Sequence, residues 1–305
     1  MNGCIGIDWG SSNLRAYEMA ADGTVLERRS SAAGALRDRA GGFEAALREV
    51  VGDWLAAGPG LPVVLSGMVG SRQGWMEVPY AGCPAGIEDI ARGILFHDLG
   101  DGTRLAFVPG LVVHPPGGPP DVMRGEEVQL LGTGRDGLHC LPGTHSKWAL
   151  VRDGRIERFG THMTGETFEL LTRHGVLGRL MDLDAPRDPD AFARGLDRAR
   201  EPGGLLHHLF SARTLGLFGE LVGGLGPAAL PSYLSGLLIG HEILGQISLE
   251  PPVEPVVLVG SPALTRAYGD ALSSFGIASV EAPGDAAAIG LFRLARIAFN
   301  RGSSP

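Results

Sequence analysis

Residues 10–16, GSSNLRA, align without a gap on residues 143–149, GTHSKWA. In each copy an apolar strand meets a glycine and hydroxyl residues at a tight turn, and a second strand follows. An Asp-Gly pair, at 22–23 in one copy and at 153–154 in the other, then turns the chain into a third strand. The chain therefore contains a duplicated β-meander, which predicts two related lobes that face one another.

The segments around the meanders alternate between helix and strand patterns. Apolar residues recur at helical spacing in 43–55, and 62–65 has the pattern of a buried strand, which predicts an α/β layer. Residues 112–120 are rich in Pro and Gly, and near them we predict the boundary between an N-terminal lobe, 1–120, and a C-terminal lobe, 121–305. Beyond the second meander the pattern predicts strands at 256–259 and 277–280 and helices at 164–174, 205–221, 232–247, 262–275 and 285–299.

The composition indicates a folded protein with a large core, because 44% of the 305 residues are hydrophobic and 20% are charged. The net charge is −8 and no Lys-rich or Arg-rich run occurs, so nucleic-acid binding is not expected. Cys4, Cys83 and Cys140 show no C-x-x-C spacing, which favours a reducing, cytoplasmic location. Polar residues interrupt the apolar segment 234–249, so we expect a buried helix there and no membrane span, and no export signal is found.

The repeated turns have the chemistry of phosphate-binding loops, because glycine permits close approach and the turn offers N–H and hydroxyl groups to an anion. Asp8, just before the first turn, is predicted to accept hydrogen bonds from water bound to Mg²⁺. Taken singly, each turn is better explained as an ordinary hairpin, and only the repetition favours phosphate binding. The expected nucleotide contacts are Gly10, Ser11, Ser12 and Asn13 in the first turn and Gly143, Thr144 and Ser146 in the second.

Other phosphate-binding motifs are missing from the sequence. Residues 141–147, LPGTHSK, differ from a P-loop because Gly143 is not followed by Lys and the upstream glycine is absent. The protein-kinase motifs are not found, and no G-x-G-x-x-G follows the first strand. The absence of these motifs narrows the class of phosphate-binding protein to which the chain can belong.

Longer motifs resemble a known superfamily. Residues 7–16 resemble the first phosphate motif of actin, Hsp70 and the sugar kinases, and 141–148 occupy the place of the second. Residues 256–260 resemble the adenosine motif, although Ser261 follows Gly260 where the superfamily often has a second glycine. With these, several more specific runs resemble the 2-dehydro-3-deoxygalactonokinase family from Ile5 to about Leu294: 67–75 (GMVGSRQGW), 79–80, 83–84, 121–127 (DVMRGEE) and 233–240 (YLSGLLIG).

This resemblance implies an α/β, two-lobed, actin-like ATPase fold of the ribonuclease H type. It also implies transfer of the γ-phosphoryl group of ATP, with Mg²⁺, to the 6-hydroxyl of 2-dehydro-3-deoxy-D-galactonate in galactonate catabolism. In sugar kinases of the superfamily an acid follows a glycine at the head of a helix, and Gly125-Glu126-Glu127 matches that place with Glu instead of the more usual Asp. Glu126 is the expected general base and Glu127 the alternative, although both acids also suit a helix N-terminus.

The loop at 67–75 is expected to bind the acceptor. Arg72 can pair with the carboxylate of a sugar acid or can bond its own loop, and Trp75 can stack on the sugar or pack in the core. Lys147 is expected to assist catalysis by reaching the phosphates, or else is an ordinary strand lysine. The expected acceptor contacts are Gly67, Met68, Ser71, Arg72, Gln73 and Trp75.

Fold and phosphate turns do not choose the acceptor. A kinase of another sugar acid or of a ketose is therefore the first alternative. A nucleotide-switched ATPase of the Hsp70 or actin kind is the second, which is disfavoured because we see no peptide-binding domain and no filament-scale insertion. The expected partner is a small sugar acid, with neither nucleic acid nor membrane, and a homodimer is left open.

Overall fold

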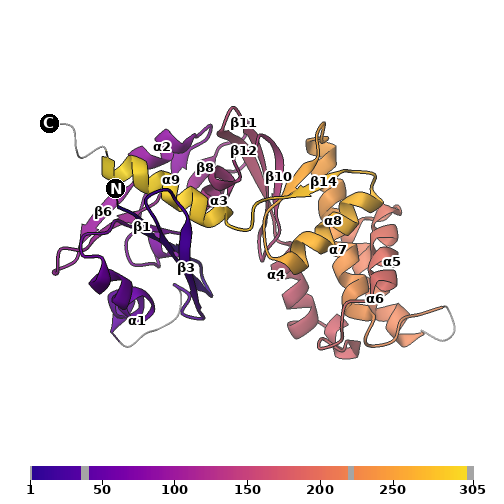
Figure 1. The fold of residues 1–305 in the computed structure, drawn as a ribbon. Helices are drawn as coiled ribbons and strands as arrows, with labels where there is room; N and C mark the ends of the chain where they lie inside the picture. The colour runs from indigo at the N-terminus through magenta and orange to yellow at the C-terminus, as the bar shows by residue number, and fades with distance from the viewer. Residues whose placement is uncertain (1, 36–40, 219–222, 301–305) are drawn as a thin grey trace. The chain divides into compact units, whose positions relative to one another are not determined.

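The computed structural model describes residues 2–35, 41–218 and 223–300, which form two compact units (Figure 1). Unit 1 is drawn from residues 1–136, 149–159 and 282–305, and unit 2 from residues 137–148 and 160–281. The functional lobes that we expect at 1–120 and 121–305 stay a prediction.

The first sheet lies in unit 1 and has the strand order β3-β2-β1-β4-β7-β6. β1 pairs antiparallel with β2 and parallel with β4, and β4 pairs parallel with β7. The meander strands predicted from the sequence at 4–9, 14–19 and 24–29, and the strand predicted at 62–65, are confirmed within two residues. The strands are β1 (Cys4–Trp9), β2 (Leu14–Met19), β3 (Val25–Ser31), β4 (Val63–Ser66), β6 (Leu95–Asp98) and β7 (Arg104–Phe107).

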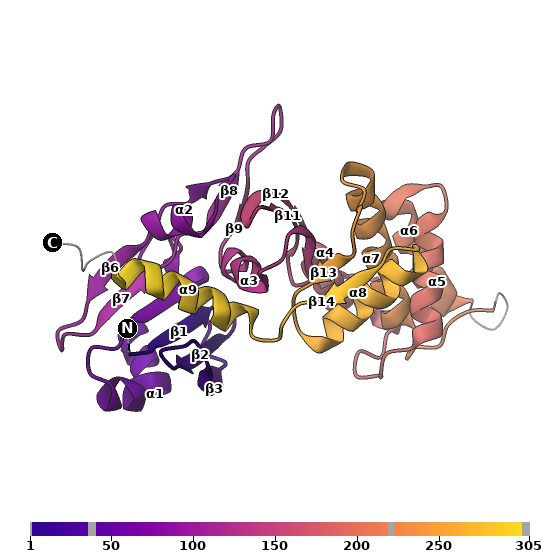
Figure 2. The same cartoon turned by 45° about the horizontal axis from the view of Figure 1, so that its top comes forward.

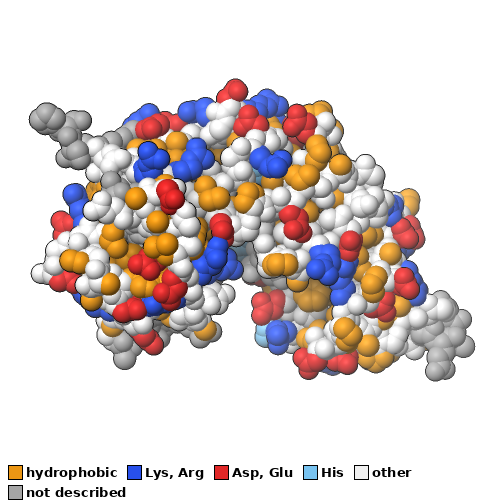
Figure 3. Space-filling model, in the orientation of Figure 1, with side chains coloured by type: hydrophobic (Ala, Val, Ile, Leu, Met, Phe, Trp, Pro, Cys, Tyr) orange, Lys and Arg blue, Asp and Glu red, His pale blue; other side chains and the backbone are white. Residues whose placement is uncertain are grey.

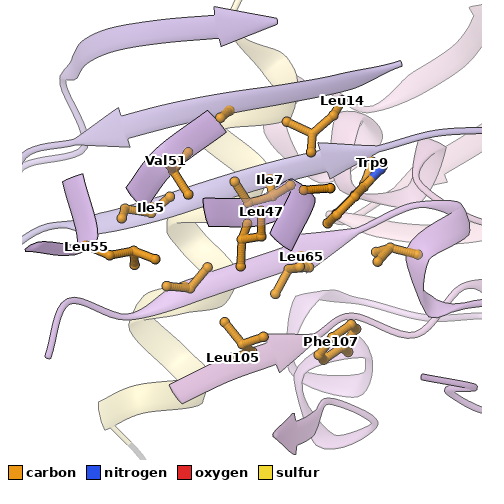
Figure 4. Close-up of a cluster of buried hydrophobic side chains, with 14 of the residues drawn as sticks. Ile5, Ile7, Trp9, Leu14, Leu47, Val51, Leu55, Leu65, Leu105 and Phe107 are labelled. Carbon is orange, nitrogen blue, oxygen red and sulfur yellow. The ribbon is translucent and has the colours of Figure 1, made fainter. Parts of the chain in front are cut away.

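Helices cover both faces of this sheet. α1 (Gly42–Ala57) packs on β2 and β3, and α9 (Ala286–Asn300) packs on β1, β2 and β4 (Figures 2 and 4). α9 also contacts α2 (Ile87–Arg92) and α3 (Glu126–Thr133). Because both faces are covered, β1 and β4 are buried along almost their whole length.

The largest part of the unit 1 core lies between α1 and the sheet (Figure 4). Full burial of each such aliphatic or aromatic side chain contributes about 1.5–3 kcal/mol. This packing fixes the carboxyl ends of β1 and β4. The side chains of this core that are labelled in Figure 4 are Ile5, Ile7, Trp9, Leu14, Leu47, Val51, Leu55, Leu65, Leu105 and Phe107.

A small sheet of order β5-β8-β9 also lies in unit 1. Its strands are β5 (Ala81–Gly82), β8 (Leu111–Val113) and β9 (Asp121–Met123), and β8 pairs antiparallel with β9. Residues 114–120 form a loop that extends from this hairpin (Figure 2). The predicted irregular connection at 112–120 is thus mostly a hairpin loop inside unit 1.

The second large sheet has the order β12-β11-β10-β13-β14. β10 pairs parallel with β13, and β13 pairs parallel with β14. A meander followed by two parallel strands also describes β3-β2-β1-β4-β7, so the duplication predicted from the two turns is confirmed. The strands are β10 (Gly137–Leu141), β11 (Ser146–Arg152), β12 (Arg155–His162), β13 (Val256–Leu258) and β14 (Ser279–Glu281).

Helices dominate the rest of unit 2. The helix predicted at 205–221 ends at Leu217, and its predicted residues 219–221 lie outside the described residues. The helix predicted at 164–174 is continuous but changes from α4 to a wider turn, η2. The elements are α4 (Thr164–Glu169), η2 (Leu170–His174), η3 (Leu177–Leu180), α5 (Pro189–Arg200), α6 (Gly204–Leu217), α7 (Leu230–Leu249) and α8 (Pro262–Ser274).

α5 and α7 pack against each other at unusually close range. A Cβ atom at Gly195 of α5 would lie 2.1 Å from the carbonyl oxygen of Tyr233, and one at Gly236 of α7 would lie 2.1 Å from that of Phe192. Glycine at these positions lets the two backbones touch.

Charges of both signs are interspersed on the face shown in Figure 3, and Lys and Arg form no continuous basic band there. Within 2–35, 41–218 and 223–300, no helix has the length and apolar character needed to cross a membrane.

Candidate active site

The first phosphate turn joins β1 to β2 in unit 1. Ser11, Ser12 and Asn13 are exposed and Gly10 is half-buried. The turn lies at the carboxyl end of β1, the edge at which ligands bind in α/β sheets. Its amide and hydroxyl groups are therefore accessible to an anion, as predicted.

Asp8 is the penultimate residue of β1, and only 15% of its side chain is exposed. Its Oδ2 lies 3.7 Å from Nη1 of Arg15. Burial raises the pKa of Asp8 to about 6, while the charge of Arg15 opposes this rise and the charge of Glu126 adds to it. The carboxylates of Asp8 and Glu126 thus repel each other, which favours a cation beside them.

Three chain segments of unit 1 meet beside Asp8: the ends of β1 and β4 and the start of α3. Gly67 follows β4 and Gly125 precedes α3, with φ angles of 90° and 113°. A Cβ atom at residue 125 would lie 3.3 Å from Cα of Gly67 and 3.9 Å from Oδ1 of Asp8. Glycine is required here by both the backbone angle and the contact.

α3 begins with two glutamates in different surroundings. Glu126 is half-buried and its Oε2 accepts a hydrogen bond from the Arg124 N–H at 3.1 Å. Glu127 is fully buried, and its Oε2 accepts from the Gly125 N–H at 2.7 Å, whereas no hydrogen bond from a described residue reaches Oε1. Burial, and then the charge of Glu126, raise the pKa of Glu127 to about 8. Because such a carboxyl is protonated at neutral pH, Glu126 is better suited to accept a proton.

The predicted acceptor loop begins at this site. Gly67 is beside Asp8, Met68 is half-buried in the short turn η1 (Met68–Gly70), and Ser71 donates a hydrogen bond to the Met68 carbonyl at 2.8 Å. Gln73 is exposed. Arg72 is also at the surface, with 84% of its side chain exposed, and its Nε lies 3.3 Å from Oε1 of Glu77.

Trp75 belongs to an aromatic cluster in the unit 1 core. Its ring stacks on Phe43 with centroids 6.0 Å apart and meets the edge of Phe107 at 5.7 Å. Packing is therefore enough to explain this residue.

Arg124, which sequence reasoning did not single out, lies against the same loop. Its Nη2 donates to the Val78 carbonyl at 2.8 Å, and its guanidinium lies 4.3 Å from the ring centroid of Tyr80. Its Nε and Nη1 are buried, and neither has a hydrogen-bond partner among the described residues. The run 121–127 contained this residue, but no pattern within the run indicates where its side chain lies.

The second phosphate turn joins β10 to β11. Thr144 is exposed and Gly143 is half-buried, as a phosphate contact requires. Ser146 is fully buried instead, with its Oγ 2.9 Å from the Tyr268 hydroxyl. Lys147 is 6% exposed and its Nζ donates to Oγ1 of Thr161 at 2.7 Å.

A buried carboxylate, Glu242 of α7, supports this turn and was not identified from the sequence. It accepts hydrogen bonds from Trp148 Nε1 at 2.8 Å, from the Tyr268 hydroxyl at 2.7 Å and from the Thr164 hydroxyl. Tyr268 in turn contacts Ser146, so the network joins β11, α4, α7 and α8. The sequence shows only an isolated acid in an apolar helix.

Gly260, the predicted adenosine-side residue, is exposed just beyond β13. A Cβ atom there would lie 3.7 Å from the carbonyl oxygen of Pro142, so the segment after β13 adjoins the second phosphate turn within unit 2. The two segments of unit 2 that were predicted to bind nucleotide therefore lie side by side.

A duplicated meander sheet with a glycine turn after the first strand of each copy is the arrangement of the actin-like fold, which includes sugar kinases. The sequence profile of the 2-keto-3-deoxy-galactonokinase family matches residues 8–294. The chain belongs to this family.

Named relatives agree with that assignment. The 2-dehydro-3-deoxygalactonokinase of Escherichia coli (strain K12) is 36% identical over 286 residues, which cover 93% of this chain and 94% of the relative. A Rhizobium meliloti (strain 1021) protein named a probable 2-dehydro-3-deoxygalactonokinase is 39% identical over 285 residues, or 89% of each chain. A crystal structure from Sinorhizobium meliloti, provisionally named the same kinase, superposes with a TM-score of 0.83 at 36% identity and covers 96% of each chain.

Proposed function

We propose that the protein transfers the γ-phosphoryl group of ATP to the 6-hydroxyl of 2-dehydro-3-deoxy-D-galactonate, a step of galactonate catabolism. Membership of the 2-keto-3-deoxy-galactonokinase family supports the substrate class. The observation that carries the proposal is the meeting of Asp8, Gly67 and the Gly125–Glu126 start of α3 beside the first phosphate turn. Phosphoryl transfer needs such a pairing of a base with a charge-neutralising site.

In this proposal Glu126 is the general base that orients the attacking hydroxyl and takes its proton. Its half-buried carboxylate is held by the Arg124 N–H and lies near Asp8. Glu127, with its raised pKa, is better suited to hold the start of α3 through the Gly125 N–H.

Asp8 suits a hydrated Mg²⁺ ion. Mg²⁺ usually keeps several waters and takes one or two carboxylates together with substrate phosphates, and bound there it would neutralise charge on the transferred group. The described residues contain no cluster of three or more His, Cys, Asp and Glu side chains that could hold a metal. A single acidic contact fits an ion that arrives with ATP.

We propose that ATP phosphates bind at both turns, through Gly10, Ser11, Ser12 and Asn13 and through Gly143 and Thr144, with Gly260 on the adenosine side. The exposure of these residues supports this role. Ser146 and Lys147 contact Tyr268 and Thr161 instead, so we propose that they act on the turn from the protein interior.

The acceptor loop is proposed to contribute Gly67, Met68, Ser71, Arg72, Gln73 and Trp75, with Arg72 pairing with the carboxylate. Arg124 is the second cation beside this loop and is the alternative for that pairing. We place the reaction in the cytoplasm, and the three unpaired cysteines are compatible with a reducing compartment. Besides ATP and Mg²⁺, the proposed reaction requires only the sugar acid as a partner. The reaction is compatible with either a monomer or a homodimer.

A coupled assay for ADP formation, run over a panel of 2-keto-3-deoxy sugar acids and ketoses, tests the proposal. We expect the highest kcat/KM with 2-dehydro-3-deoxy-D-galactonate, and ³¹P–¹H correlation in the product should place the phosphate on C6. A higher kcat/KM for another acceptor would support the kinase but overturn the substrate. ATP turnover independent of every acceptor would favour the switched ATPase.

A further inference from the structure

The duplication extends beyond the turns to a glycine at the same place in both copies. β3 ends at Ser31 and β12 ends at His162. Gly34 and Gly165 each follow the end of that third strand by three residues. Neither glycine has a positive φ angle, so conformational freedom does not explain them.

In unit 1, Gly34 lies directly against the backbone of the first phosphate turn. A Cβ atom at residue 34 would lie 2.0 Å from the Ser11 carbonyl oxygen and 2.3 Å from Cα of Ser12. The next residue, Ala35, donates its N–H to the Gly10 carbonyl at 2.8 Å. Trp9 fixes the same segment, because its Nε1 donates to the Ala33 carbonyl at 2.8 Å.

In unit 2, Gly165 lies against the backbone of the second turn, although its contacts are shifted by one residue relative to the aligned positions of the first turn. A Cβ atom at residue 165 would lie 2.4 Å from the Gly143 carbonyl oxygen and 2.8 Å from Cα of Thr144. The next residue, Glu166, donates its N–H to the Thr144 carbonyl at 2.9 Å. This segment is fixed by the hydrogen bond from Thr164 to Glu242.

These contacts decide which way the turn amides point. A trans peptide unit is planar, and its C=O and N–H point in opposite directions. The Gly10 carbonyl and the Ser11 N–H belong to one peptide unit. Because the Ala35 N–H donates to this carbonyl, the Ser11 N–H is directed away from Ala35. The same reasoning directs the His145 N–H away from Glu166.

We propose that Gly34 and Gly165 are positioning residues that hold the two phosphate turns with the Ser11 and His145 N–H groups oriented toward nucleotide phosphate. The proposal rests on the proposed ATP-dependent function. Any side chain at either position displaces backbone atoms of its turn, so the amide of that turn loses its orientation.

Gly34→Ala and Gly165→Ala test the proposal against matched glycine controls. Gly290→Ala is the control in unit 1, since its Cβ would lie 2.0 Å from the Val128 carbonyl, and Gly195→Ala is the control in unit 2, at 2.1 Å from the Tyr233 carbonyl. We expect at least about a tenfold rise in KM for ATP and in Kd for Mg·AMP-PNP in the two test variants, with KM for the sugar acid within about twofold. The controls should lose Tm to a similar extent and keep their nucleotide affinity. Equal loss of affinity in test and control variants would overturn the proposal.

A second pair of variants tests the same idea if Gly165→Ala does not fold. Glu166→Pro removes the N–H that binds the Thr144 carbonyl, and proline is tolerated in the first turn of a helix. Glu166→Ala keeps that N–H and removes only the side chain, including its contact with His145. Mg·AMP-PNP should bind at least about tenfold more weakly to Glu166→Pro than to Glu166→Ala. Equal affinities would contradict the proposal.

Wild-type protein separates this inference from the proposed function. If wild type binds Mg·AMP-PNP but phosphorylates no sugar acid, the substrate assignment fails while the glycine comparison still stands. If the glycine variants bind the nucleotide like wild type while sugar acid is phosphorylated, only the inference fails.

Discussion

At the scale of single residues, Asp8 combines burial with a nearby acid, Glu126, so its charged form is disfavoured unless a cation is present. Asp8→Asn should therefore keep or slightly raise Tm while kcat falls by about 100-fold or more, because positioning of the metal ion is lost. The measurement is kcat at saturating Mg²⁺ together with the melting temperature. A kcat close to that of wild type would remove Asp8 from the metal site.

Glu127 should make stability depend on pH. Its pKa in the folded protein is about 8, above the ordinary value of 4.5, so folding favours the protonated form. This stabilisation is complete below about pH 4.5 and is lost as pH rises through 8, at no more than about 1.4 kcal/mol per pH unit. Urea unfolding at pH 5 to 8 should show a decline for wild type that is clearly smaller in Glu127→Gln. Parallel curves would contradict the assignment.

Arg72 and its neighbour Glu77 offer a matched test of acceptor binding. Arg72→Ala should raise KM for the sugar acid about tenfold and leave KM for ATP unchanged, because only the acceptor carries the carboxylate. Glu77→Ala removes the ion-pair partner of Arg72 and should not raise KM for the sugar acid. If Arg72→Ala has no effect and Arg124→Lys raises that KM, the pairing belongs to Arg124.

At the scale of elements, the sequence predicted those strands and helices whose pattern is local. β1 and β2 match their predicted residues, and α7, α8 and α9 match theirs within two residues at each end. α5 was missed although Asp188 caps it and Pro189 begins it, because its hydrophobic stripe is set among many charges. The segment 87–107, with α2, β6 and β7, was also left unassigned.

The site was predictable only where it consists of consecutive residues. The two turns and the Gly125–Glu126 start of α3 could be found because glycine and polar residues adjoin in the sequence. Arg124, Gly34 and Glu242 act through partners that are 22 or more residues distant in the chain. The periodicity of a sequence does not reveal contacts between distant residues, so these three residues could be identified only from the structure.

The Glu242 network predicts a stability effect that reaches across four elements. Glu242→Ala leaves the Trp148 N–H without its acceptor, and the free energy of unfolding should fall by roughly 2–4 kcal/mol. Glu242→Gln should recover much of this loss, because the hydroxyls of Thr164 and Tyr268 can accept as well as donate. Gln246→Ala, one helical turn along α7, is the control. Equal losses for Glu242→Ala and Glu242→Gln, measured by urea unfolding, would argue against the network.

At the scale of the whole molecule, the proposed base and metal residue lie in unit 1 and the second phosphate turn lies in unit 2. Water is a poor substitute for the sugar hydroxyl that Glu126 is proposed to orient, so ATP hydrolysis without sugar acid should be about 100-fold slower than phosphorylation. ADP release should be measured with and without the acceptor in wild type and in Glu126→Gln, which reports the rates without the proposed base. Rapid hydrolysis in the absence of acceptor would favour the nucleotide-switched ATPase.

The packing of α9 on β1 sets a condition on synthesis of the protein. β1 is translated long before α9, yet its Gly6 lies against Leu291 of α9, where a Cβ atom would be 3.0 Å from Leu291 Cδ1. At 5–20 residues per second the ribosome needs roughly 15–55 s to reach α9 after finishing β1. Throughout that interval the nascent sheet lacks its cover and exposes an apolar face. The α9 side of β1 is therefore covered much later than the side that packs on α1, so this face of the growing sheet should favour aggregation until α9 has been made.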